Sequence, residues 1–161
     1  MKTHGVANRW MPLFGWMFLI FVGSTDALSA EQTSRFVVPF LLWLDPQESV
    51  ATITTIHFAL RKLGHFAEYA ILATLFWCAL RGILIAFRPF VIAGFVLFAS
   101  TVFAASDEIH QSFVPSRTAS PRDVMIDICG AAIALAICVA LRGRSQRARR
   151  WAYLKAEQCR F

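Results

Sequence analysis

The residues best suited to chemistry in this chain lie in one short stretch, residues 106–117, and in two acids that follow it. The stretch contains adjacent acids, a histidine, a glutamine and an arginine, namely Asp107, Glu108, His110, Gln111 and Arg117. Asp123 and Asp127 come next, and the apolar runs 89–105 and 124–141 flank the group. Ionisable groups beside lipid-embedded helices are costly unless paired, so they are functional candidates.

Two neighbouring carboxylates and a histidine predict acid–base chemistry. Like charges in a poorly hydrated site repel, which favours one carboxylate holding a proton while the other stays ionised. Asp107 and Glu108 form such a pair and His110 follows them, so these are the candidate catalytic residues. On a helix Glu108 and Gln111 share one face, with Asp107 and His110 on a neighbouring one. The alternative is a solvated helix end, the commoner fate of an isolated Asp-Glu pair.

A second group lies earlier in the chain. His65, Glu68 and Tyr69 are spaced i, i+3 and i+4, so on a helix they share one face. Glu68 falls about one turn inside an apolar run, where an ionised carboxylate needs a partner, and His65 or Arg61 could supply one. We predict that these four residues bind substrate. The alternative is a buried pair that only fixes helix packing.

Arginine and carboxylate chemistry completes the candidate site. Arg117 follows a turn at Pro115 and suits bidentate contact with phosphate or carboxylate, so with Gln111 it is assigned to substrate binding. Asp123 and Asp127 are spaced i, i+4 at the start of the next helix. The helix dipole favours a negative charge in the first turn, which accounts for Asp123. It does not account for Asp127, which lies one turn further along the helix. The two are assigned as candidate metal ligands, because carboxylate-rich sites suit divalent cations such as Mg²⁺. The sequence does not identify a cofactor beyond this candidate divalent cation.

The elements that must position these residues are membrane helices. Hydrophobic residues make up 57% of the 161-residue chain and charged residues 16%, against about 25% charged in soluble domains. We predict an all-α bundle of four transmembrane helices over residues 10–141, between an N-terminus 1–9 and a basic tail 142–161. The spans are residues 10–23, 65–80, 89–106 and 124–141. Residues 36–44 form a short interfacial segment, and residues 48–63 an amphipathic lead-in.

Two further expectations concern processing and cysteine. The short first apolar run resembles a signal peptide, but the following residues give only a weak cleavage pattern, so we expect it to be retained. The four cysteines show neither disulfide-framework nor metal spacing. We expect the three in apolar runs, Cys78, Cys129 and Cys138, to be buried free thiols.

The charges predict an orientation. With the N-terminus in the cytoplasm and four spans, most of the 16 lysines and arginines fall inside and most acids fall outside. Both termini would then be cytoplasmic, with the polar cluster facing the opposite side. The arginine run 144–150 would bind anionic lipid. The sequence has no basic stripe on a soluble domain, so it does not indicate nucleic-acid binding. Membrane lipids are therefore the expected partners, and the oligomeric state is open.

Residues 61–69, 106–117 and 123–130 resemble the VanZ-like family of bacterial integral membrane proteins, and the combination of Glu108, Gln111, Arg117 and Asp123 is fairly specific. The chain departs from the family pattern at Ser116, where glycine is usual, and at Asp127, where asparagine is frequent. The resemblance implies a multi-pass protein of the bacterial cytoplasmic membrane. Some members are associated with resistance to the glycopeptide teicoplanin, but the family brings no established mechanism.

Two functional hypotheses are therefore consistent with the sequence. The first is an intramembrane or interfacial enzyme that acts on a lipid-linked or cell-envelope ligand by acid–base or metal-assisted chemistry. The second is a non-catalytic membrane protein whose polar cluster locks the bundle through His65–Glu68 and Arg117–Asp123 pairs and which alters envelope access. A small transporter is a weaker third option, since repeats and broken helices are lacking. Convergence of the candidate residues on an open pocket favours the first function, and mutual pairing without a cavity favours the second.

Overall fold

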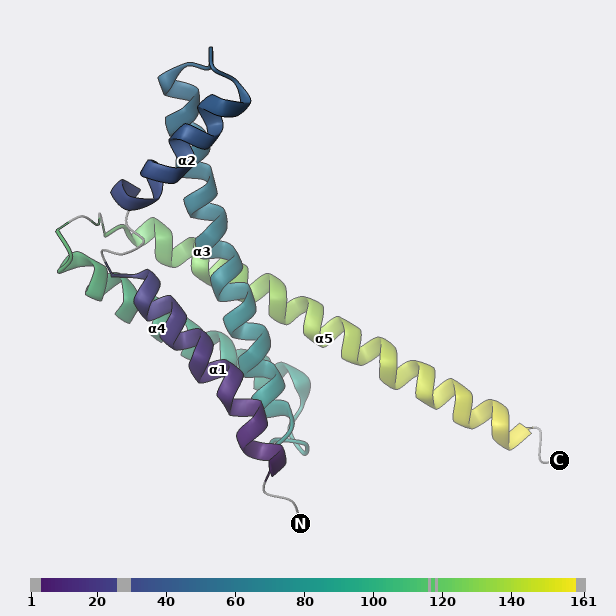
Figure 1. Ribbon diagram of the computed structural model, residues 1–161. Coiled ribbons are helices and arrows are strands. Elements are labelled where there is room, and N and C mark those ends of the chain that lie inside the picture. Colours follow the sequence, from purple (N-terminus) through teal and green to yellow (C-terminus); the bar gives the residue numbers. More distant parts are fainter. Residues whose placement is uncertain (1–3, 26–29, 116, 118, 159–161) are drawn as a thin grey trace.

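A computed structural model describes residues 4–25, 30–115, 117 and 119–158, and these described parts contain helices and no strands. Figure 1 shows how the helices are arranged. The predicted all-α fold is confirmed. The five helices are α1 (His4–Gly23), α2 (Ala30–Leu44), α3 (Val50–Arg81), α4 (Pro89–Ser112) and α5 (Pro121–Gln158).

Local sequence signals explain several of the helix ends. The N–H of Thr52 donates to the hydroxyl of Ser49 at 3.1 Å, so Ser49 caps the start of α3. Helices α4 and α5 both begin with proline, which is favoured at the first helical position because it has no N–H to leave unpaired. Helix α4 ends at Ser112, shortly before the turn expected at Pro115.

Two helices are longer than the sequence predicted. The expected lead-in and the span after it form one 32-residue helix, α3, which is about 48 Å long against a hydrocarbon core of about 30 Å. Likewise α5 continues for 38 residues, through what had been predicted as a separate tail. Only single glycines, Gly64 and Gly143, lie at these two junctions. One glycine costs a helix about 1 kcal/mol, which is too little to break a long one.

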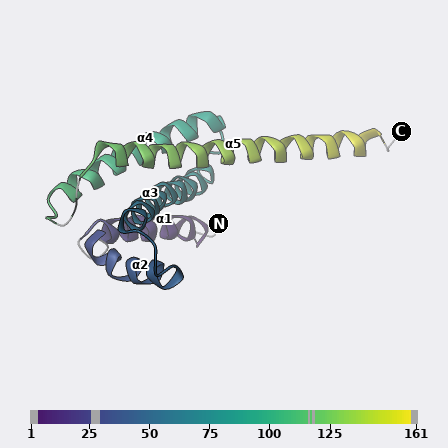
Figure 2. The ribbon, with the colours of Figure 1, turned by 90° about the horizontal axis from the view of Figure 1, so that it is seen from above.

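Helix α3 is the central element and packs against each of the other four helices. Figures 1 and 2 show that α1 and α4 run in one direction and α3 and α5 in the other. As a result, the end of α1, the end of α4 and the start of α5 meet beside the middle of α3. The second half of α5 extends away from the bundle.

Three of the described helices are long and apolar enough to cross a membrane: α3, α4 and the part of α5 from Pro121 to Ala148. The predicted first span is helical as part of α1, and its crossing of the membrane stays a prediction. Helix α2 has 15 residues, fewer than the roughly 20 that a span needs. Outward-facing side chains are strongly apolar, for example Phe18 and Phe98, which are 65% and 69% exposed. Such a surface suits lipid rather than water.

Between α3, α4 and α5 lies a close-packed apolar core that includes Trp77, Ile92, Val96 and Leu135. At one point α3 and α5 approach so closely that only glycine fits. A Cβ atom on Gly130 would overlap the backbone carbonyl of Phe66. Small residues such as Gly130 are what allow two membrane helices to approach this closely.

The expected burial of the cysteines was wrong for two of the three in apolar runs. Cys78 and Cys129 are exposed on the outside of the bundle, and Cys138 is half-buried. Free cysteine behaves as a small hydrophobic residue, and a lipid-facing surface suits it as well as a core does. All three are free thiols, whereas Cys159 lies outside the described residues.

Candidate functional site

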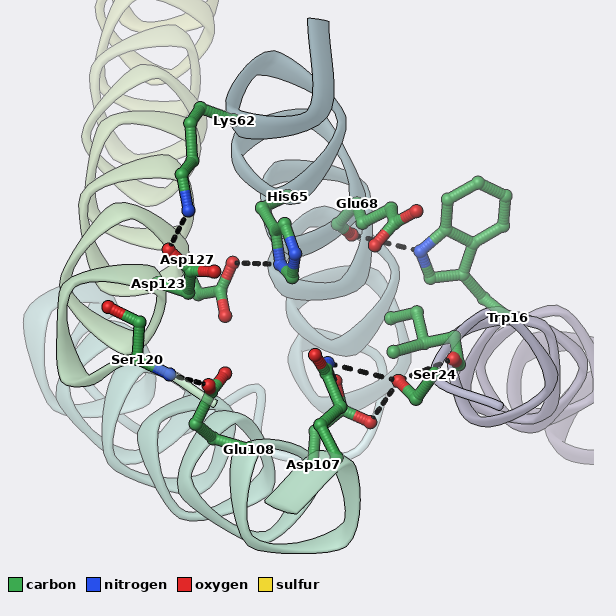
Figure 3. A network of polar contacts seen from close by, with 12 residues as sticks. Trp16, Ser24, Lys62, His65, Glu68, Asp107, Glu108, Ser120, Asp123 and Asp127 are labelled. Atoms are coloured by element: carbon green, nitrogen blue, oxygen red, sulfur yellow. Dashed lines mark hydrogen bonds and ion pairs between the residues drawn. The ribbon is translucent and has the colours of Figure 1, made fainter. Parts of the chain in front are cut away.

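The polar residues of four helices meet in one layer at the end of the bundle (Figure 3). Helices α1 and α4 join there through Ser24 and Asp107, which are in hydrogen-bond contact. The amide of Gln111, one turn further along α4, donates to Asp107 at 3.0 Å. The Ser24 hydroxyl also lies 3.0 Å from the carbonyl of Ile20. A hydroxyl has one hydrogen, so Ser24 donates to one of these two acceptors at a time.

Two further contacts join α4 and α3 to the start of α5. The carboxylate of Glu108 accepts a hydrogen bond from the backbone N–H of Ser120, the residue that precedes α5. Asp123, in the first turn of α5, pairs with the ammonium of Lys62 on α3. Both carboxylates thus lie at a helix N-terminus, where unpaired N–H groups and the helix dipole favour negative charge.

The deepest contact of the layer joins His65 on α3 to Asp127 on α5. Nδ1 of His65 and Oδ1 of Asp127 are 3.3 Å apart, close enough for an ion pair, but out of line for a hydrogen bond. Asp127 is 1% exposed and His65 8%. Nearby on α3, Tyr69 is fully buried, and its hydroxyl has no hydrogen-bond partner among the described residues.

Arg117 connects the loop after α4 to the end of α1. Its guanidinium donates to the backbone carbonyl of Gly23, and its Nε and Nη2 atoms lie 3.3 and 3.1 Å from the carbonyl of Thr25. The last carbonyls of a helix lack partners within the helix, and a basic side chain can satisfy them. Arg117 therefore holds the end of α1 against the polar layer.

A cavity of about 250 Å³ opens beside this layer, between α1, α2, α3 and the end of α4. Among the described residues, two arginines, two histidines and one carboxylate give its wall an excess of basic groups. Apolar Val37 and Leu60 complete one side, and Thr33 lies 3.2 Å from Nε2 of His57. The charged and polar side chains on the wall are Ser24, Thr33, His57, Arg61, His65, Glu68, Gln111 and Arg117.

The structure divides the predicted site residues into two sets. Five of the residues predicted to bind substrate line the cavity: Arg61, His65, Glu68, Gln111 and Arg117. The remaining predicted residues are not part of its wall. Tyr69, Asp107, Glu108, Asp123 and Asp127 are buried in the layer behind it, and the ring of His110 packs on Phe21 of α1 at a centroid distance of 4.8 Å.

The individual pairings differ from those expected. His65 faces Asp127 rather than Glu68, and Asp123 pairs with Lys62 rather than Arg117. The reason is geometric, since spacing along one helix identifies shared faces but not which neighbouring helix each face meets. Ser116, where the chain departs from the family pattern, lies outside the described residues.

Several residues of the site had not been identified from the sequence. Ser24, Thr33 and Ser120 are common polar residues whose positions carry no distinguishing pattern. His57 is different, because it had been interpreted as a surface or interfacial residue and instead lines the cavity. It lies four residues before Arg61 and eight before His65, so a helical register over residues 57–68 would have found it.

The carboxylates do not gather as metal ligands in the described part of the chain, where no group of three or more His, Cys, Asp or Glu side chains could hold an ion. Asp123 and Asp127 instead face Lys62 and His65. Their assignment as metal ligands stays a prediction to which this arrangement adds no support.

Long helices with apolar outer faces, packed around a buried polar layer and a charged cavity, define a helical membrane protein with an internal polar site. The VanZ/LLP1 family model matches residues 10–142, which include the whole layer, and the chain belongs to this family. No curated protein and no solved structure matches the chain.

Proposed function

We propose that the cavity binds the anionic headgroup of a lipid-linked or cell-envelope ligand. The observation that carries this proposal is the composition of the cavity wall, where, among the residues that the structure describes, Arg61, Arg117 and two histidines outnumber the carboxylate of Glu68. Guanidinium groups suit phosphate and carboxylate, and Val37 and Leu60 offer apolar contact to a chain attached to such a headgroup.

The proposed orientation of the protein in the membrane follows from the distribution of its lysines and arginines. Most lysines and arginines lie toward the ends of the chain and at the junction of α3 and α4, which predicts that these parts are cytoplasmic. Helix α1 begins and α5 ends away from the polar layer (Figure 1), as this arrangement requires. The cavity would then open toward the outer face of the bacterial cytoplasmic membrane, where envelope intermediates are handled.

Within the cavity, each residue type has a distinct role. Arg61 and Arg117 supply positive charge, and Gln111 and Ser24 supply hydrogen bonds to a bound headgroup. His57, His65 and Glu68 are titratable groups on the wall and are therefore placed to move a proton in a reaction. Asp107, Glu108 and His110 act from behind the wall as positioning residues in this proposal.

Lipid profiling tests the proposal. Total lipids and lipid-linked intermediates are compared between cells with and without the protein, and cells that make only Arg61→Gln. We expect the Arg61→Gln profile to match that of cells lacking the protein. Arg35→Gln is the matched control, because Arg35 is exposed on α2 and does not line the cavity. An identical profile with and without the protein would contradict the proposal.

A second function is favoured by the pairing in the polar layer. Asp107, Glu108 and Asp123 each have a partner on another segment, which is what a purely structural cluster would show. In this alternative the protein changes envelope access and susceptibility to teicoplanin without chemistry. Arg61→Gln and Glu68→Gln that accumulate normally and leave teicoplanin susceptibility at the wild-type level would favour it, whereas a loss of the phenotype in both would support a working cavity.

A further inference from the structure

A second groove lies between the end of α3 and the middle of α5. Figure 1 shows that α5 diverges from α3 at this end of the bundle. It encloses about 460 Å³ and is lined on the α3 side by Trp77 and Arg81. The α5 side contributes Leu141, Arg142 and Ser145, which are spaced to lie on one helix face. This groove shares no residue with the cavity described above.

The charge in this groove is entirely positive. Arg81 is exposed and Arg142 half-buried, and no carboxylate is among the described residues that line the groove. Ser145 and Gln146 add a hydroxyl and an amide beside the two guanidinium groups. Such a set matches a phosphate, which can accept bidentate bonds from arginine and single bonds from the neutral donors.

The depth of the groove matches that of lipid headgroups. The apolar run of α3 ends at Leu80 and Arg81 follows, and the apolar run of α5 ends at Leu141 and Arg142 follows. Both arginines therefore lie at the boundary where hydrocarbon gives way to headgroups. Basic pockets between transmembrane helices at this boundary suit anionic lipids.

An apolar groove of about 380 Å³ continues from the charged one along α3 and α5. The two grooves share Cys138 and Leu141, and the apolar one is further lined by Ile71, Leu75 and Ile137. A charged groove that joins an apolar one has the shape of a site for a molecule with a charged head and a hydrocarbon chain.

We infer that this pair of grooves binds one anionic phospholipid of the surrounding bilayer. Its phosphate lies between Arg81 and Arg142, and an acyl chain lies along Ile71, Leu75 and Ile137. The lipid would fill the space between the diverging helices and fix the angle at which α5 leaves the bundle. This site is independent of the proposed function, because it lies at the other end of the molecule.

Native mass spectrometry of the full chain in detergent tests the inference, with titration of phosphatidylglycerol, phosphatidylcholine or inorganic phosphate. We expect one phosphatidylglycerol to stay bound and the Arg81→Gln/Arg142→Gln variant to bind it roughly tenfold or more weakly, because two charge-assisted contacts are lost. Ser145→Trp keeps both charges but fills the groove, and should lower binding similarly. The Arg144→Gln/Arg147→Gln variant removes two exposed charges outside the groove and should leave binding unchanged.

Three results would overturn the inference. Equal binding of phosphatidylcholine would show that the charge is not recognised. An equal loss in the Arg144/Arg147 control would show diffuse attraction to a basic surface. Displacement of the lipid by millimolar inorganic phosphate would show that the groove recognises free phosphate. Circular dichroism of each variant checks that the helices are retained.

Discussion

The two ends of the bundle are built from the same helices but are held together differently. At one end α3, α4 and α5 meet through Trp77, Val96 and Leu135, and at the other through charged and polar side chains. Burial does not distinguish the ends, since Val96 is 0% exposed and Asp127 1%. What differs is that the apolar end needs complementary shape, whereas at the polar end most groups have a specific partner.

This difference matters more in a membrane than in water. Lipid tails are as apolar as leucine, so burial of leucine between helices gains little hydrophobic free energy. Close packing at Gly130 and the polar pairs at the other end therefore carry more of the specificity. We infer that the pairs of Asp107, Glu108 and Asp123 favour one arrangement of the helices over others.

The largest loss of stability is expected where α3 and α5 approach most closely, between the two ends of the bundle. Gly130→Leu places a side chain where the carbonyl of Phe66 lies, so α3 and α5 must separate, at a cost of about 3 kcal/mol or more. Thermal unfolding in detergent measures it. Gly94→Leu is the control, because a Cβ atom on Gly94 meets nothing within 4 Å. Equal stability of the two variants would show that the close approach is not needed.

A pair of alanine substitutions compares the two ends directly. Leu135→Ala leaves a cavity and Asp127→Ala leaves His65 without its charged neighbour, each at about 3 kcal/mol. In a His65→Ala background the cost of Asp127→Ala should fall, whereas the cost of Leu135→Ala should not change. Unfolding of the single and double variants measures both. If both costs are the same in the two backgrounds, the ends do not differ as described.

The coupling free energy between Lys62 and Asp123 should be smaller than the stability costs given above. Lys62 is partly exposed, with 22% of its side chain accessible, so water screens part of the attraction. A double-mutant cycle with Lys62→Met and Asp123→Asn should give about 1 kcal/mol of coupling. The same cycle with Arg122 in place of Lys62 is the control, since Arg122 is exposed. Identical coupling in both cycles would mean that the contact is not specific.

An effect of similar size is expected at the hydrogen bond that joins α1 to the cavity-lining turn of α3. The indole N–H of Trp16 donates to the backbone carbonyl of Glu68 at 2.9 Å. Trp16→Phe keeps the ring and loses the donor, at a cost of about 1 kcal/mol. Trp43→Phe is the control, because Trp43 is 75% exposed. A cost for Trp16→Phe no greater than that of the control would mean that this bond does not hold α1.

The sequence predicted the kind of fold and the members of the polar cluster, and it failed on the contacts between them. The shared helix face made His65 one of two candidate partners for Glu68, with Arg61 as the other, yet His65 faces Asp127 on α5. The helix breaks expected before residue 65 and after residue 141 are also absent. A single glycine costs a long helix too little free energy to end it.

By itself the sequence determined that this protein is helical, that its outer face is apolar, and that its acids gather near one end of the spans. These properties follow from composition and from periodicity along one chain. Only the tertiary structure decided that Arg61, His65, Glu68, Gln111 and Arg117 face one cavity while Asp107, Glu108 and Asp123 support it from behind. That division depends on how far each helix is rotated about its axis, and contacts with other helices set that rotation.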